Sequence, residues 1–137
     1  MKNPLASYPG YLLRRAASSR LAQLGKHLEP FGLGIGEASI LALIHFNPDI
    51  SQAECGRALS IQRTNLNPVM HRLIDRGLVI ASKGPGRTQL LRLTAEGEAL
   101  TGRVLVEFEA QEERIFAAVP AHLREELVPL LRSLIVE

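Results

Sequence analysis

The side chains with the most chemical capacity lie close together, between positions 62 and 76. At helical spacing, the apolar residues fall on one side: Leu66, Val69, Met70, Leu73 and Ile74. The opposite side carries hydroxyl, amide, imidazole and guanidinium groups: Arg63, Thr64, Asn65, Asn67, His71, Arg72 and Arg76. Such groups hydrogen-bond base edges and phosphates when a helix enters the DNA major groove. A surface helix without a binding role more often mixes Glu with Lys, and the one acid here is Asp75.

The helix over residues 62–76 is therefore predicted to read DNA. Four of its side chains are expected to face bases: Asn65, Asn67, His71 and Arg72. Two more, Arg63 and Thr64, are expected on bases or on the backbone.

A second predicted contact lies just before this helix. Ser51-Gln52-Ala53-Glu54 matches a capping box, which opens a short helix over residues 52–59. Because a helix N-terminus attracts anions, Ser51 and Gln52 are predicted to hold a phosphate. A turn at residues 60–61 leads into the next helix, which Gly77 ends. Helix, tight turn and helix is the arrangement of a DNA-binding helix-turn-helix.

A hairpin follows, because the apolar period changes from about four to two. Residues 78–82 and 90–93 predict two strands, joined by a Gly-rich, basic link over residues 83–89. This projecting hairpin adds three basic side chains to the predicted surface: Lys83, Arg87 and Arg92. Of these, Arg87 is best placed to enter a minor groove.

The charge distribution favours a polyanionic partner. The whole chain carries a formal net charge of +2. Residues 57–92 hold seven Lys or Arg against one Asp, whereas residues 93–137 hold four Arg against nine Glu. A basic middle segment beside an acidic one indicates a nucleic-acid surface, although a solvated charged face would give the same count.

No motif for catalysis, metal binding or cofactor binding is present. The glycines at 32, 34 and 36 follow no strand, so they predict a loop between helices and not a dinucleotide site. The histidines lack the spacing of metal ligands: His27, His45, His71 and His122. We therefore expect no enzyme activity, no metal and no cofactor.

The single cysteine, Cys55, excludes an internal disulfide and favours a reducing compartment. A redox switch would need an exposed, electropositive thiol. Cys55 instead stands four residues before Leu59 in the short helix, where an apolar side chain is expected. This placement favours a buried structural thiol. No segment resembles a signal peptide or a membrane span, so we expect a cytoplasmic protein with no membrane partner.

Helices are predicted for most of the remaining chain, over residues 4–28, 35–46, 95–119 and 121–136. Pro129 is expected to kink or divide the last of them. The helix over 95–119 would be about 37 Å long and carries an apolar seam that includes Phe108. The seam and the Leu-rich last helix expose more apolar surface than a monomer tolerates, which predicts a dimer.

In this order, the segments resemble the MarR-type winged-helix regulators. The resemblance is carried by Gly10-Tyr11-Leu12-Leu13-Arg14-Arg15-Ala16, residues 51–59, Arg63-Thr64-Asn65-Leu66-Asn67-Pro68, Leu73-Ile74-Asp75-Arg76-Gly77-Leu78-Val79 and Leu93-Thr94-Ala95-Glu96-Gly97. Together these matches cover nearly the whole chain. The resemblance implies a symmetric dimer, held by its first and last helices, that represses transcription until a small ligand or an oxidant releases it.

The resemblance also implies the architecture. We expect one mostly helical α+β domain over residues 1–137, a winged helix-turn-helix with N- and C-terminal dimerisation helices. The DNA-binding lobe would cover residues 33–94, and the dimerisation region residues 4–30 and 95–137. The partners are then a pseudo-palindromic double-stranded DNA operator, a second copy of the chain and a small-molecule effector.

The effector pocket of the family lies between the dimerisation helices and the DNA-binding lobe. That place corresponds to four residues here: Tyr8, Tyr11, Arg15 and His45. Phenol rings and a guanidinium would suit an aromatic acid or its CoA thioester, and the alternative is that these residues pack in the dimer.

Two positions depart from the family pattern. Pro85 stands where the wing usually has an acid, two residues before the tip arginine, Arg87. Cys55 stands where the family has a buried Leu, and the reactive cysteine of its peroxide-sensing branch, in the first helix, has no counterpart here. An alternative function of another class stays open, namely a winged-helix protein-interaction module that does not bind DNA.

Overall fold

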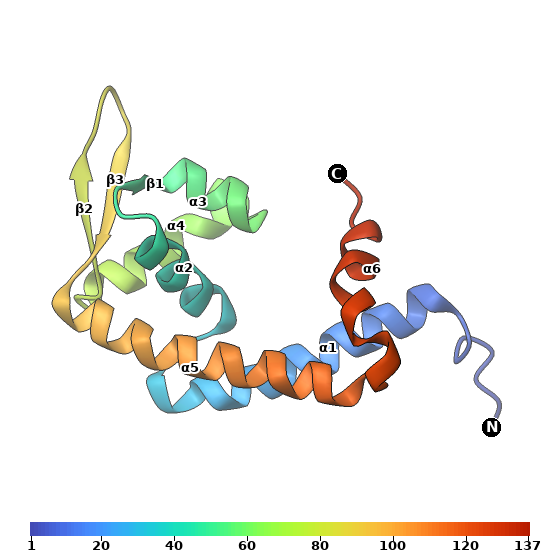
Figure 1. The fold of residues 1–137 in the computed structure, drawn as a ribbon. Helices are drawn as coiled ribbons and strands as arrows, with labels where there is room; N and C mark the ends of the chain where they lie inside the picture. The colour runs from blue at the N-terminus through green and yellow to red at the C-terminus, as the bar shows by residue number, and fades with distance from the viewer.

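The computed structural model describes residues 1–137 and confirms a mostly helical α+β fold. Its six α-helices are α1 (Pro9–Leu28), α2 (Ile35–Phe46), α3 (Gln52–Leu59), α4 (Arg63–Asp75), α5 (Ala95–Ala118) and α6 (Leu127–Ser133). The three strands are β1 (Ile50–Ser51), β2 (Val79–Lys83) and β3 (Gln89–Leu93), and two 3-10 turns are η1 (Glu29–Phe31) and η2 (Ala121–Glu126). Figure 1 shows a lobe, made of α2, α3, α4 and the strands, at one end of the long helix α5.

The sheet has the strand order β1-β3-β2, and both pairs are antiparallel. Val79 pairs with Leu93 at the base of the β2–β3 hairpin, and Lys83 pairs with Gln89 near its tip. The hairpin projects from the lobe as a wing (Figure 1). The two-residue strand β1 was not predicted, because so short a segment shows no alternation of apolar and polar residues.

The wing is joined tightly to the start of α5. The Thr94 hydroxyl donates to the Gly77 carbonyl at 2.6 Å and accepts from the Gly97 amide at 3.0 Å. A Cβ atom added to Gly97 would lie 2.0 Å from the Leu78 carbonyl oxygen, so only glycine fits there. Gly77 itself has a φ of 74°, as predicted for a left-handed helix end.

The hydrophobic core lies in the lobe. Twelve of its fourteen buried apolar residues fall between positions 33 and 91, and the other two are Leu28 and Val104. The lobe thus closes its own core, and two residues of α1 and α5 complete it.

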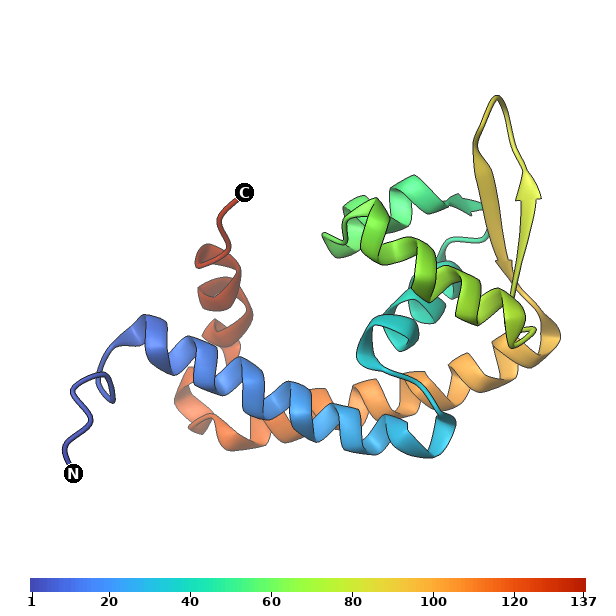
Figure 2. The ribbon, with the colours of Figure 1, turned by 180° about the vertical axis from the view of Figure 1, so that it is seen from behind.

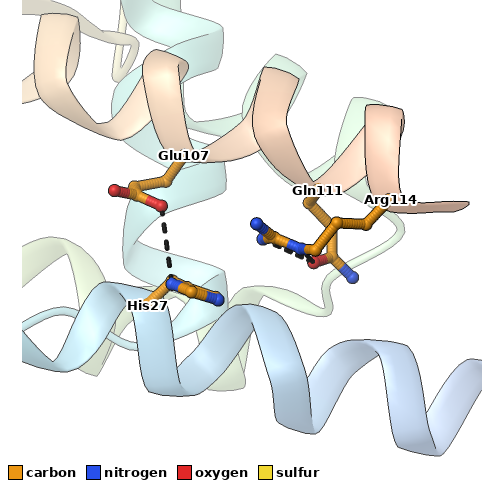
Figure 3. Close-up of polar contacts among 4 residues, drawn as sticks. All are labelled: His27, Glu107, Gln111 and Arg114. Carbon is orange, nitrogen blue, oxygen red and sulfur yellow. Dashed lines mark hydrogen bonds and ion pairs between the residues drawn. The ribbon is translucent and has the colours of Figure 1, made fainter.

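The remaining helices, α1, α5, η2 and α6, form what we call the arm. In Figure 1, α1 lies beside α5, and both chain termini lie at the far end from the lobe. Gln111, 4% exposed, donates from Nε2 to the Arg20 carbonyl at 3.0 Å and accepts from Arg114 at 2.9 Å. His27 Nδ1 lies 3.7 Å from Glu107 Oε2 one turn away (Figure 3). These pairs show that α1 and α5 run antiparallel.

Three details of the arm differ from expectation. The first helix begins at Pro9, because Asn3 to Ser7 form turns in which the Asn3 side chain accepts from the Leu5 amide. The last helix divides at Leu127, so Pro129 lies in the first turn of α6, where a missing N–H removes no hydrogen bond. Phe108 is half-buried against the chain's own core and is not a free seam residue. No helix of the structure combines the length and the apolar character that crossing a membrane requires.

Candidate nucleic-acid interface

The turn between α3 and α4 is built by the close approach of Gly56 and Ile61. The Ile61 amide donates to the Gly56 carbonyl at 2.8 Å, and Ser60 adopts the left-handed conformation with a φ of 54°. A Cβ atom on Gly56 would lie 3.0 Å from the Ile61 carbonyl oxygen. The small residue therefore lets the two helices meet, and α4 is set at a fixed angle to α3.

The helix α4 has the two faces that its sequence predicts. Leu66, Met70 and Leu73 are buried, while its polar side chains are exposed or half-buried. Pro68 lies in the second turn of the helix, beyond the first-turn positions whose N–H groups have no partner within the helix. Because proline has no N–H, the Thr64 carbonyl loses its usual donor and is left to solvent.

An open groove of about 990 Å³ lies between α3, α4 and the wing. It brings together six of the ten predicted DNA-binding residues: Ser51, Gln52, Arg63, Asn67, His71 and Arg87. The other four are exposed but do not line it: Thr64, Asn65, Arg72 and Lys83. No Asp or Glu lines the groove, so its charged side chains are all basic. A polar groove of one charge sign attracts a polyanion.

Two of the groove's amides are joined to each other. Gln52 Nε2 of α3 donates to Asn67 Oδ1 of α4, and both side chains are half-buried. With Oδ1 engaged in this bond, the Nδ2 group of Asn67 stays available as a donor and the Oε1 atom of Gln52 as an acceptor. Gln52 therefore orients Asn67, and its contact with a phosphate stays a prediction.

The capping box at the start of α3 is present. The Glu54 amide donates to Ser51 Oγ at 3.1 Å, and the Ser51 amide donates to Glu54 Oε2 at 2.9 Å. These contacts, the Ser51 amide first, lower the pKa of Glu54. Ser51 Oγ accepts within the box, so its hydroxyl hydrogen remains free to donate to a phosphate.

The wing places one unpaired guanidinium at its tip. Arg87 follows Gly86, whose φ is 63°, and makes no hydrogen bond or ion pair within the chain. Arg92 differs from expectation: its Nε and Nη2 atoms each donate to the Asp49 carboxylate at 2.6 Å. This pairing lowers the pKa of Asp49 and ties β3 to the loop before β1. Arg92 thus ties the base of the wing to the loop before β1, and two of its three nitrogen atoms are engaged within the chain.

Several groove residues were not predicted, and Arg57 is the clearest of them. It lines the groove with Ala53, Gly56 and Ser60. These positions are three and four residues apart, so they share one face of α3. That spacing was a usable signal, because a small–small–Arg–Ser face beside a recognition helix is too polar for a core. Thr88 and Gln89 of the wing line the groove as well.

Cys55 is buried and has no contact with a second thiol. Burial raises the pKa of its thiol to about 11, and the neighbouring Glu54 carboxylate contributes to the increase. The thiol is therefore protonated near neutral pH. This supports the structural interpretation over the redox one.

The four predicted effector residues fall into two separate places. The Tyr11 hydroxyl accepts from Arg15 at 3.4 Å and from Asn3 at 3.1 Å, and the hydrogen bond from Arg15 is the main cause that lowers the pKa of Tyr11. Tyr8, one turn earlier, is 57% exposed. His45, on α2, instead holds Glu98 of α5, with 2.6 Å between Nδ1 and Oε2.

One chain alone cannot join these two places. Glu98, which holds His45, and Gln111, which holds the Arg20 carbonyl, are about 20 Å apart along α5 at 1.5 Å per residue. Tyr11 lies farther away in the same direction, because α1 and α5 are antiparallel. A site that contains both Tyr11 and His45 would need the first helix of a second copy.

The chain is similar along nearly its whole length to known transcriptional regulators. No family model matches the sequence. A curated protein of Thauera aromatica, named provisionally as the transcriptional regulatory protein for the hcr operon, is 25% identical over 133 residues, which are 95% of this chain and 80% of that protein.

Solved structures give the same result. The MarR family protein RV2887 of Mycobacterium tuberculosis, in complex with salicylic acid, is 30% identical with a TM-score of 0.72, over 94% of this chain and 97% of that one. The repressor CouR, bound to a 23-mer DNA duplex, is 25% identical with a TM-score of 0.86, over 97% and 98%. CouR of Rhodococcus jostii RHA1 has also been solved with p-coumaroyl-CoA. PcaV of Streptomyces coelicolor, in complex with its natural ligand, is 25% identical with a TM-score of 0.79, over 97% and 95%. Identity at this level over whole chains, together with the shared winged helix, means that the chain belongs to the MarR family of transcriptional regulators.

Proposed function

We propose that this chain is a transcriptional repressor that binds a pseudo-palindromic DNA operator as a homodimer and leaves it when a small aromatic ligand binds. The observation that carries the proposal is the basic groove between α3, α4 and the wing, in which Arg63, Asn67 and Arg87 converge without a carboxylate. A recognition helix beside a wing suits a major groove flanked by a minor groove.

Each element of the groove has a distinct role in this proposal. Asn67, oriented by Gln52, contacts a base edge. His71, one helical turn later on the same face of α4, contacts a neighbouring base. Arg63 and the Ser51 hydroxyl hold phosphates, and Arg87 enters the minor groove. Thr64, Asn65, Arg72 and Lys83 are exposed around the groove and contact the flanking backbone or bases.

The DNA-binding test uses the region upstream of the gene for this chain as a fluorescent duplex. We expect at least about 10³-fold tighter binding to a site within it than to a scrambled duplex of the same composition. Equal binding to both duplexes, or none, would contradict the proposal. If neither duplex is bound, the protein-interaction module is favoured, whose basic face would instead bind an acidic protein.

The effector is proposed to be an aromatic carboxylic acid or its CoA thioester. RV2887 with salicylic acid and CouR with p-coumaroyl-CoA support this ligand class. In this chain, Arg15 would hold the carboxylate or phosphate, and the rings of Tyr8 and Tyr11 would contact the aromatic group. His45 of the other subunit would complete the site, since the two places are far apart within one chain.

Thermal shift with salicylate and with an aromatic acyl-CoA tests this part. We expect a ligand that raises the melting temperature to weaken operator binding in the same concentration range. Arg15→Ala should remove both effects. Arg14→Ala is the matched control, because Arg14 lies over the Tyr11 ring but donates no hydrogen bond to its hydroxyl. Equal loss in both variants would contradict the assignment of Arg15.

A further inference from the structure

We infer that Arg76 is a positioning residue that fixes the C-terminal end of α4 to the turn between α1 and α2. Through this contact it sets the separation of the two recognition helices in a dimer. The inference rests on the proposed function, because it concerns how the DNA-binding lobe is held by the arm.

The contact is a fork between one guanidinium and two carbonyls. Arg76 Nη1 donates to the Gly32 carbonyl at 2.9 Å, and Nη2 donates to the Phe31 carbonyl at 3.0 Å. Gly32 ends η1 in the left-handed conformation, with a φ of 65°, and the guanidinium lies against its Cα face. A planar fork with two parallel donors matches this pair of oxygens, and the compact ammonium of a lysine does not reproduce that fork geometry.

The same turn is held from its other side by the arm. The Arg103 guanidinium of α5 lies 4.8 Å from the centre of the Phe31 ring, a distance at which a cation attracts an aromatic face. Phe31 is itself half-buried against the core. The turn at Phe31 and Gly32 is therefore linked to α4 through Arg76 and to α5 through Arg103.

The placement of Arg76 separates it from the DNA-binding face. At 3.6 residues per turn, Arg63, Asn67 and His71 follow one flank of α4, and Arg72 and Arg76 follow the opposite flank. The first three line the groove, and the last two do not. Figure 2 shows α4 running across the lobe to the base of the wing, above the connection between α1 and α2. Arg76 was predicted on the outward polar face, but its guanidinium is turned to that connection.

Few other side-chain hydrogen bonds fix α4. Its helix residues make one to another element, from Gln52 to Asn67 near its N-terminal half. Arg76 supplies the hold at the other end. A dimer that reads two half-sites needs its recognition helices one helical repeat apart, about 34 Å or a multiple. A contact between α4 and the joint of lobe and arm controls that separation without touching DNA.

The experiment compares Arg76→Ala and Arg76→Lys with Arg72→Ala on the upstream duplex, at several salt concentrations. A second duplex carries one extra base pair between its half-sites. We expect Arg76→Ala to weaken binding at the natural spacing by about tenfold and to bring the affinity ratio of the two duplexes toward one. The slope of log binding constant against log salt concentration should stay unchanged, and Arg76→Lys should not restore the affinity. Arg72 is exposed and is proposed to contact the flanking DNA. Arg72→Ala should therefore lower the affinity for both duplexes and leave their affinity ratio unchanged.

Two results would overturn the inference. In the first, Arg76→Ala lowers the slope of log binding constant against log salt concentration by about one unit, and Arg76→Lys restores it. A residue that contacts a phosphate would behave in that way. The other is unchanged affinity and unchanged spacing preference. If Arg76→Ala does not fold, Arg103→Ala takes its place. Arg103 is exposed, and removing its guanidinium releases the same turn from α5.

A readout without DNA separates this inference from the proposed function. Hydrogen exchange of the amides at residues 31–34 should be faster in Arg76→Ala than in the parent and in Arg72→Ala. If the parent protein shows no sequence preference, the proposed function fails, and this exchange still decides whether Arg76 holds the turn. Equal exchange in all three proteins would show that it does not.

Discussion

The lobe and the arm of this protein differ in how much of their apolar surface they bury within one chain. The lobe closes a core of its own, and only Phe46 and Ile80 among its large apolar side chains remain exposed. The arm and the terminal segments that flank it leave many more exposed: Leu5, Tyr8, Leu12, Leu13, Leu21, Val106, Leu123, Val128, Leu130, Leu131, Leu134, Ile135 and Val136. No residue of α6 or η2 is buried. The lobe thus buries its apolar side chains within one chain, whereas the arm exposes an apolar surface that a second copy would cover.

The largest effect should come from breaking the arm. Val106 is 63% exposed and Leu131 is 42% exposed, so replacing both with Glu should prevent dimerisation while the lobe stays folded. Losing the second half-site should weaken operator binding by roughly 10²-fold or more. Light scattering gives the mass, and circular dichroism checks the fold. A double variant that remains dimeric would show that another surface joins the subunits. Phe108→Glu is unsuitable, because that ring packs on the chain's own core.

A smaller effect is expected within the recognition helix. Asn67→Ala should weaken the operator by about 1–3 kcal/mol while binding to random duplex changes little. Gln52→Ala should have part of the same effect, since it only orients Asn67. The measurement is a pair of titrations on two duplexes. Equal loss on both duplexes would mean that Asn67 contacts the backbone and not a base.

The core of the lobe gives a prediction that does not depend on DNA. Cys55→Ser places a hydroxyl where the thiol is fully buried, which should lower the free energy of unfolding by about 1–3 kcal/mol. Because the pKa of the thiol is raised to about 11, alkylation by iodoacetamide should be slow in the folded protein at pH 8 and fast after unfolding. Peroxide-induced release of DNA that Cys55→Ser abolishes would contradict this structural role.

The smallest change is expected at the tip of the wing. With Pro85 in place of an orienting acid, Arg87 should act mainly as a positive charge. Arg87→Ala should weaken binding to specific and random DNA alike. It should also reduce the slope of log binding constant against log salt concentration by about one unit. Arg87→Lys should recover much of the loss. A variant that loses specificity and keeps its slope would assign base readout to the wing.

The sequence predicted local features well and long-range side-chain pairs poorly. The capping box at Ser51 and the left-handed end at Gly77 depend on residues within one turn, so their spacing was sufficient. The pairs Arg92–Asp49 and Arg76–Gly32 join positions more than forty residues apart. Arg76 was predicted on the outward polar face of the recognition helix, and Arg92 among the basic side chains of the hairpin. Nothing in the local pattern says which arginine of a basic segment has a partner inside the fold.

The arm is expected to hold two lobes so that each reads half of one operator. Hydroxyl-radical footprinting of the parent dimer on the upstream duplex tests this most directly. We expect two symmetric protected segments whose centres lie about 10 base pairs or a multiple apart, with two chains bound per duplex. A single protected segment, or protection spread evenly along the duplex, would contradict it.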